Sequence, residues 1–109
     1  MHELGIVQEV IDLVTENARG ARVKRVVLEI GKLTAVLPAA IRFSFDVCSA
    51  DTAAEGAELE IVETPGRAQC RACGSELILE DPLGCCGCGS FDLAWVAGTE
   101  LKVREVELT

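Results

Sequence analysis

Residues 69–90 read QCRACGSELILEDPLGCCGCGS, and this stretch holds five of the six cysteines in the chain. Four of them form two Cys-x-x-Cys pairs, Cys70 with Cys73 and Cys85 with Cys88. A Cys-x-x-Cys turn lets two thiolates on one loop face a single ion, and two such turns complete a tetrahedron of sulfurs. We therefore predict a Zn²⁺ site whose ligands are Cys70, Cys73, Cys85 and Cys88.

A glycine follows each pair, at Gly74 and Gly89, and supplies a backbone that can adopt positive φ and turn N–H groups toward sulfur. Four protein ligands leave no open position for water or substrate, so we expect a structural site. The segment is too short to have much core of its own, and the metal must therefore fold it. We expect Cys86 to be an exposed bystander, because Cys86-x-Cys88 is tighter than the usual turn.

Other uses of the same cysteines lead to two rival functions. Iron in a rubredoxin-like site would use the same ligands, which predicts an electron carrier. Two disulfides are a further alternative, but a reducing compartment disfavours them and we expect no secretory segment. A zinc ribbon can also act as an interaction module for protein or nucleic acid. Because the chain has a net charge of −8, a phosphate backbone would be repelled, and we expect no nucleic-acid partner.

The first part of the chain predicts a helix followed by a strand. Apolar residues recur from Leu4 to Ala18 at the spacing of an amphipathic helix, and Gly20 is the expected stop. Residues 23–31, VKRVVLEIG, are rich in β-branched side chains and predict a strand. A second helix is expected from Pro38 to about Ser49, with a wide apolar stripe that buries Cys48.

Two more strands are expected later in the chain. Residues 58–63 alternate apolar and acidic side chains, and Pro65-Gly66 ends that strand. The last strand, residues 101–108, changes the parity of its apolar residues, which predicts a bulge near Arg104 or Glu105.

Together these elements predict an α+β fold, with two helices on a three-stranded mixed sheet and an inserted zinc-ribbon-like subdomain built on four cysteines. We place an α/β domain, which includes the N-terminus, at residues 1–66 plus 97–109. The zinc-binding subdomain covers residues 67–96, between the second and third strands, with candidate hinges near Gly66 and Gly98. Because no run approaches the roughly 20 apolar residues of a membrane span, we expect no membrane association.

The sequence does not predict an enzyme. The single histidine, His2, lies at the N-terminus, so neither a Ser-His nor a Cys-His pair is expected in a core. A glycine-rich phosphate loop is also lacking.

The first three residues, Met1-His2-Glu3, can form a chelate. The Met1 α-amine, the His2 backbone nitrogen and His2 Nδ1 supply three nitrogens in a plane, which suits Ni(II) or Cu(II). Glu3 can supply a fourth donor through its carboxylate or its backbone nitrogen. The same residues are also compatible with an ordinary solvated terminus, so chemistry alone leaves both interpretations open.

Six stretches carry a resemblance to a known family. They are MHELGIVQEVIDLV (1–14), VVLEIGKL (26–33), AAIRFSFDV (39–47), AEGAELEIVETPGRAQCRACG (54–74), the second CxxCGS knuckle (85–90) and GTELKVREVEL (98–108). Together they resemble the HypA/HybF family of hydrogenase nickel-incorporation proteins over nearly the whole chain. One departure is Cys86, which stands where the second knuckle of the family often has proline.

The resemblance implies a small cytoplasmic nickel metallochaperone with a structural Zn(II) site. It implies that Met1, His2 and Glu3 bind Ni(II) and that the four paired cysteines bind zinc. The implied partners are a HypB-type GTPase and the large-subunit precursor of [NiFe] hydrogenase. In some organisms the family also supports the maturation of urease.

Overall fold

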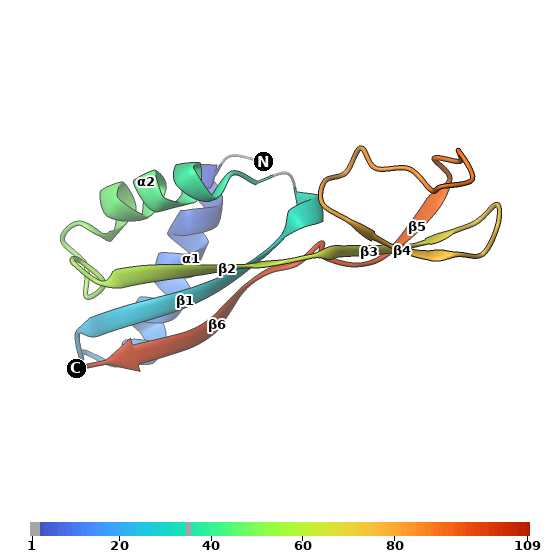
Figure 1. Ribbon diagram of the computed structural model, residues 1–109. Helices are drawn as coiled ribbons and strands as arrows, with labels where there is room; N and C mark the ends of the chain where they lie inside the picture. Colours follow the sequence, from blue (N-terminus) through green and yellow to red (C-terminus); the bar gives the residue numbers. More distant parts are fainter. Residues whose placement is uncertain (1–2, 35) are drawn as a thin grey trace. The chain divides into compact units, whose positions relative to one another are not determined.

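The computed structural model describes residues 3–34 and 36–109, and within them the chain forms two α-helices, one short 3₁₀ helix and six strands (Figure 1). The order is α1 (Glu3–Ala18), β1 (Val23–Gly31), the 3₁₀ helix η1 (Lys32–Thr34), α2 (Pro38–Ser49), β2 (Glu58–Thr64), β3 (Gly66–Cys70), β4 (Glu76–Leu79), β5 (Leu93–Ala97) and β6 (Leu101–Leu108).

Helix α1 buries one face and ends where the sequence predicts. Its core residues recur at helical spacing, which is the pattern of an amphipathic helix. Gly20 has φ +88°, a conformation that glycine adopts without steric cost, and the Ala21 N–H donates to the Ala18 carbonyl at 3.0 Å. The buried residues are Val7, Val10, Ile11, Val14 and Ala18.

Helix α2 begins at Pro38 and ends at Ser49, as the sequence predicts. Proline fits the first turn because its φ is already helical and its missing N–H would have no partner there. The buried stripe is narrower than we expected: Ile41 and Phe45 are buried, but Phe43 is 71% exposed. Cys48 is half-buried rather than buried. A helix that packs along one side leaves its opposite face exposed, whatever residues that face carries.

The first sheet has the strand order β2-β1-β6. Strands β1 and β2 run in the same direction, whereas β6 runs against β1 (Figure 1). The antiparallel pairing agrees with two backbone bonds: Thr109 N–H donates to the Arg22 carbonyl, and Gly31 N–H donates to that of Glu100. The sheet is therefore mixed, and the predicted class of two helices on a three-stranded mixed sheet is confirmed.

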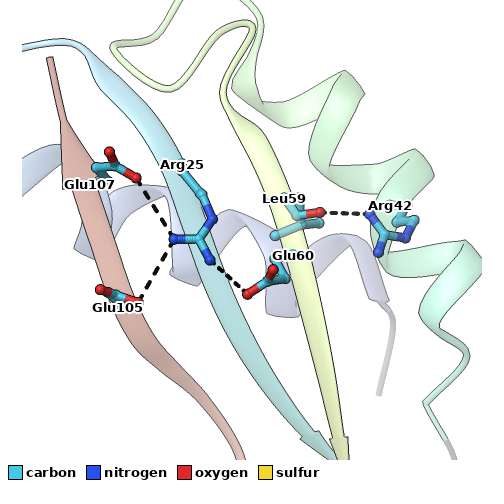
Figure 2. A network of polar contacts seen from close by, with 6 residues as sticks. All are labelled: Arg25, Arg42, Leu59, Glu60, Glu105 and Glu107. Atoms are coloured by element: carbon cyan, nitrogen blue, oxygen red, sulfur yellow. Dashed lines mark hydrogen bonds and ion pairs between the residues drawn. The ribbon is translucent and has the colours of Figure 1, made fainter.

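Arg25 links all three strands of this sheet, on the side that faces the viewer in Figure 2, with α1 behind the strands. Its Nη2 donates to Glu60 Oε2 at 2.8 Å, and its Nη1 lies 3.7 Å from Glu107 Oε2 and 3.8 Å from Glu105 Oε2. The carboxylates are about half exposed or more, so each pair is expected to contribute at most about 1 kcal/mol. In the same view, Arg42 of α2 donates to the Leu59 carbonyl of β2 at 2.7 Å.

In strand β6, the half-buried residues switch from odd-numbered to even-numbered positions at the predicted place. Leu101 and Val103 are half-buried, then Arg104 and Glu105 are both exposed, and Val106 is half-buried again. Two successive exposed residues are what an extra residue in the strand produces.

A second sheet, with the order β4-β3-β5, was not predicted from the sequence. Its pairs are antiparallel, with Ala68 of β3 opposite Leu77 of β4 and Trp95 of β5. A small core of Leu33, Ala68 and Leu79 stabilises it, and Leu77 and Leu93 pack against that core. Strands of four and five residues give too short an alternation to distinguish from loop in the sequence.

The chain divides into two compact units. Unit 1 comprises Met1–Leu28, Val36–Val62 and Val103–Thr109, and unit 2 comprises Glu29–Ala35 and Glu63–Lys102. All three strands of the first sheet, β1, β2 and β6, contribute residues to both units.

Three glycines of unit 2 lie in close backbone contact. A Cβ on Gly98 would lie 2.5 Å from the Gly66 Cα, and a Cβ on Gly31 would lie 2.1 Å from the Gly98 carbonyl oxygen. All three glycines are buried. The segments near Gly66 and Gly98 are therefore closely packed backbone, not the open linkers expected of hinges.

Candidate metal centre

Four cysteine sulfurs of unit 2 lie close enough to share one ion. The Sγ atoms of Cys70, Cys73, Cys86 and Cys88 all lie within 4.8 Å of one another. Two of the separations are 3.7 Å (Cys70 to Cys88) and 3.5 Å (Cys73 to Cys86). Zn–S bonds of about 2.3 Å in a tetrahedron place two sulfurs about 3.8 Å apart, so the spacing suits a four-sulfur zinc site.

The second sheet, β4-β3-β5, positions the turn that carries Cys70 and Cys73. Cys70 is the last residue of β3 and lies opposite Leu93 of β5. The next residue, Arg71, donates its backbone N–H to the Asp92 carbonyl at 2.9 Å, and its guanidinium lies 3.0 Å from the Asp92 carboxylate. The turn that carries Cys73 is therefore held at both its backbone and its side chains.

The structure brings together three of the four predicted zinc ligands, Cys70, Cys73 and Cys88. Cys85 is exposed and does not belong to the group. Cys86 takes the fourth place and is only 6% exposed, so our expectation that Cys86 is an exposed bystander is wrong. The spacing of cysteines in the sequence does not decide between Cys85 and Cys86. The two are adjacent, so the loop that starts at Cys73 has nearly the same length whichever of them is the ligand.

The four thiols can all lose their protons only if a cation lies among them. Hydrogen bonds from the Ser75 hydroxyl and backbone N–H, and then from Cys86, lower the pKa of Cys73 to about 6. The Cys88 backbone N–H favours the Cys86 thiolate, but the sulfurs of Cys73 and Cys88 together with burial outweigh it and raise the pKa of Cys86 to about 12. Four sulfurs this close cannot all ionise unless a positive ion lies among them. A divalent metal removes the conflict, because a coordinating thiol loses its proton.

The predicted nickel ligands Met1 and His2 lie outside the described residues. Glu3 is the first residue of α1. His2 is the only histidine of the chain, so the described residues offer no imidazole to a metal. The assignment of Met1, His2 and Glu3 to nickel therefore stays a prediction.

Fold and site together define the class: a small α+β protein with a four-cysteine metal centre in a short antiparallel sheet. Residues 1–108 match the family model described as hydrogenase/urease nickel incorporation, metallochaperone, HypA. The chain belongs to this family, as the resemblance in its sequence implied.

Relatives match along nearly their whole length. A hydrogenase maturation factor HypA from Trichormus variabilis is 56% identical over 108 residues, which is 99% of this chain and 96% of that protein. One from Geobacter metallireducens is 44% identical over 111 residues, 99% of each chain. The solution structure of the Ni metallochaperone HypA from Helicobacter pylori has a TM-score of 0.70 at 25% identity, covering 99% of this chain and 97% of that one. Among the described residues, no helix is both long and apolar enough to span a bilayer.

Proposed function

We propose that this protein carries Ni(II) on its first three residues and delivers it to the large-subunit precursor of [NiFe] hydrogenase. The observation that carries the proposal is the match to the nickel-incorporation family, which begins at residue 1 and so includes Met1-His2-Glu3. Nickel is cargo here, and zinc is the resident metal.

The donor chemistry of the terminus supports the nickel role. An α-amine, a backbone nitrogen and an imidazole nitrogen in fused chelate rings favour a square-planar ion such as Ni(II). Free α-amines titrate near pH 8, so deprotonation of such a group by a metal at neutral pH costs little. Glu3 supplies the fourth donor. A chelate at a chain terminus exposes one edge to an acceptor, so ligands can be exchanged one at a time.

The four-sulfur centre holds Zn(II) in a structural role. The core of unit 2 centres on three buried residues, too few to fold the segment without help. Soft thiolates select zinc or iron, and a closed tetrahedron of sulfurs leaves no position for a substrate. We therefore assign no catalytic step to this site, and none to the chain. As in the sequence-based division, nickel binding belongs to residues 1–66 plus 97–109, and zinc binding to residues 67–96.

The proposed partners follow from the delivery role. A HypB-type GTPase would work with this protein in the cytoplasm, and urease maturation proteins are a second destination. The net charge of −8 favours basic protein surfaces and disfavours nucleic acid.

The test is metal analysis and calorimetric nickel titration of protein with a native, untagged N-terminus. The comparison is His2→Ala, with Glu9→Ala, an exposed site on α1, as the matched control. We expect one zinc per chain in all three proteins and one nickel in all except His2→Ala. Equal nickel binding by His2→Ala would remove the terminus from the mechanism.

Retention on nucleic acid at physiological salt would favour the interaction module, and iron with a red colour would favour the electron carrier.

A further inference from the structure

The first cysteine turn is closed by two backbone hydrogen bonds that both involve Cys70. Its N–H donates to the Ser75 carbonyl at 2.8 Å, and its own carbonyl accepts from the Gly74 N–H at 2.8 Å. Gly74 has φ +78°, which lets the chain reverse between the two bonds. The sequence of this turn, residues 70–75, is CRACGS.

The second turn repeats this pattern with Cys86 in the place of Cys70. The Cys86 N–H donates to the Ser90 carbonyl at 3.0 Å, and its carbonyl accepts from the Gly89 N–H at 2.8 Å. Gly89 has φ +93°. The sequence of this turn, residues 86–90, is CGCGS, which is the first turn shortened by one residue. By its backbone hydrogen bonds, Cys86 rather than Cys85 therefore occupies the position of the first cysteine in the second turn.

Burial and sulfur contacts follow the same correspondence. The first cysteine of each turn, Cys70 or Cys86, is buried, and the second, Cys73 or Cys88, is exposed. Each buried sulfur faces the exposed sulfur of the other turn, at 3.7 Å for Cys70 with Cys88 and 3.5 Å for Cys86 with Cys73. The two turns thus contribute equivalent pairs of donors to one centre.

The chain before Cys85 is also fixed. A Cβ on Gly84 would lie 2.5 Å from Leu79 Cδ2, and Leu79 is 4% exposed in the core of unit 2. Gly84 is therefore packed against the core on one side of Cys85, and the hydrogen bonds of Cys86 hold the other side. For the Cys85 sulfur to replace that of Cys86, the second turn would have to give up these bonds.

We propose that Cys86 is the fourth ligand of the zinc centre and that Cys85 is a free, solvent-accessible thiol beside it. The proposal rests on the proposed zinc site and specifies its ligands. It makes the second turn a Cys-x-Cys loop in place of the Cys-x-x-Cys pair that the sequence predicts. The free thiol is open to soft electrophiles and soft metal ions without loss of zinc.

The first experiment maps thiol reactivity in the zinc-loaded native protein. Limited treatment with iodoacetamide, followed by peptide mass spectrometry, compares Cys85 and Cys86, with half-buried Cys48 as an internal reference. We expect rapid modification of Cys85 and protection of Cys86 until a chelator removes the zinc. Protection of Cys85 with modification of Cys86 would overturn the assignment, and so would equal protection of the two.

The second experiment compares Cys85→Ser with Cys86→Ser, two identical substitutions at neighbouring positions. Competition with a chromophoric chelator measures zinc affinity. We expect Cys85→Ser to match the native protein and Cys86→Ser to bind at least about tenfold more weakly, because even outer partners of a metal contribute roughly 10–100-fold. The reverse order, or equal losses, would contradict the proposal. If Cys86→Ser fails to fold, the reactivity map of the native protein still decides.

Failure of the nickel role would leave these results unchanged, because neither experiment contains nickel. Absence of zinc from the native protein would instead overturn the zinc site on which the proposal rests.

Discussion

Gly31 and Gly98 lie so close together that a Cβ on Gly31 would be 2.1 Å from the Gly98 carbonyl oxygen. The contact forms where the chain leaves β1 for η1, and the Leu33 N–H donates to that same Gly98 carbonyl at 2.9 Å. A side chain at Gly31 would have to push backbone away, because the atom it meets belongs to the main chain.

Gly31→Ala should therefore destabilise the protein, by about 1–3 kcal/mol or more, through overpacking. The matched control is Gly5→Ala in α1, where an added Cβ meets nothing within 4 Å and alanine favours the helix. Urea unfolding of the zinc-loaded proteins measures both. A Gly31→Ala midpoint equal to that of the native protein would show that the backbone can separate at no cost.

The buried and exposed faces of α2 should respond differently to truncation. Ile41 has no exposed surface, so Ile41→Ala should cost about 2–5 kcal/mol by removing buried methyl groups and leaving a cavity. Val47 lies on the same helix but is 55% exposed, so Val47→Ala should change stability by no more than about 0.5 kcal/mol. Thermal or urea unfolding compares them. Similar losses at the two sites would mean that the outer face of α2 is covered in solution.

Arg25→Gln should destabilise the first sheet modestly, by about 1 kcal/mol, because Glu60, Glu105 and Glu107 lose a shared cation. The loss should shrink at high salt, where the remaining repulsion between the carboxylates is screened. A double-mutant cycle with Glu60→Gln isolates the contact between Arg25 and Glu60, which is the shortest of the three. An effect that does not depend on salt would point to lost packing of the arginine stem instead.

Removal of the metal should affect the two units unequally. Unit 2 has a small core of Leu33, Ala68 and Leu79, whereas unit 1 has a larger one that includes Val7, Ile11 and Val14 of α1. Treatment with a strong chelator should therefore abolish hydrogen-exchange protection in β3 and β5 and preserve it in α1. Re-addition of zinc should restore the lost protection. Retained protection in β3 without metal would show that the sheet folds on its own.

The sequence alone determined the elements whose patterns are long. Helix α1, strand β1 and helix α2 begin and end within a residue or two of the predicted positions, because their periodicity extends over nine to sixteen residues and glycine or proline marks the ends. The parity change in β6 was also readable, since it depends only on which residues are apolar. The cysteine pattern likewise predicted that four cysteine sulfurs of residues 69–90 lie close together. Three of the four that do so, Cys70, Cys73 and Cys88, were among the predicted residues.

Tertiary structure alone decided three further features. The strands of the second sheet are stabilised by one another and by Leu33, a residue distant in sequence, so short local patterns could not reveal them. Phe43 is apolar yet exposed, because what packs against a helix decides which of its apolar residues are buried. The choice of Cys86 over Cys85 follows from backbone hydrogen bonds to Ser90 and Gly89 that set which sulfur points inward. Residue types specify which donors a chain possesses, but only the path of the folded backbone brings a particular donor to the centre.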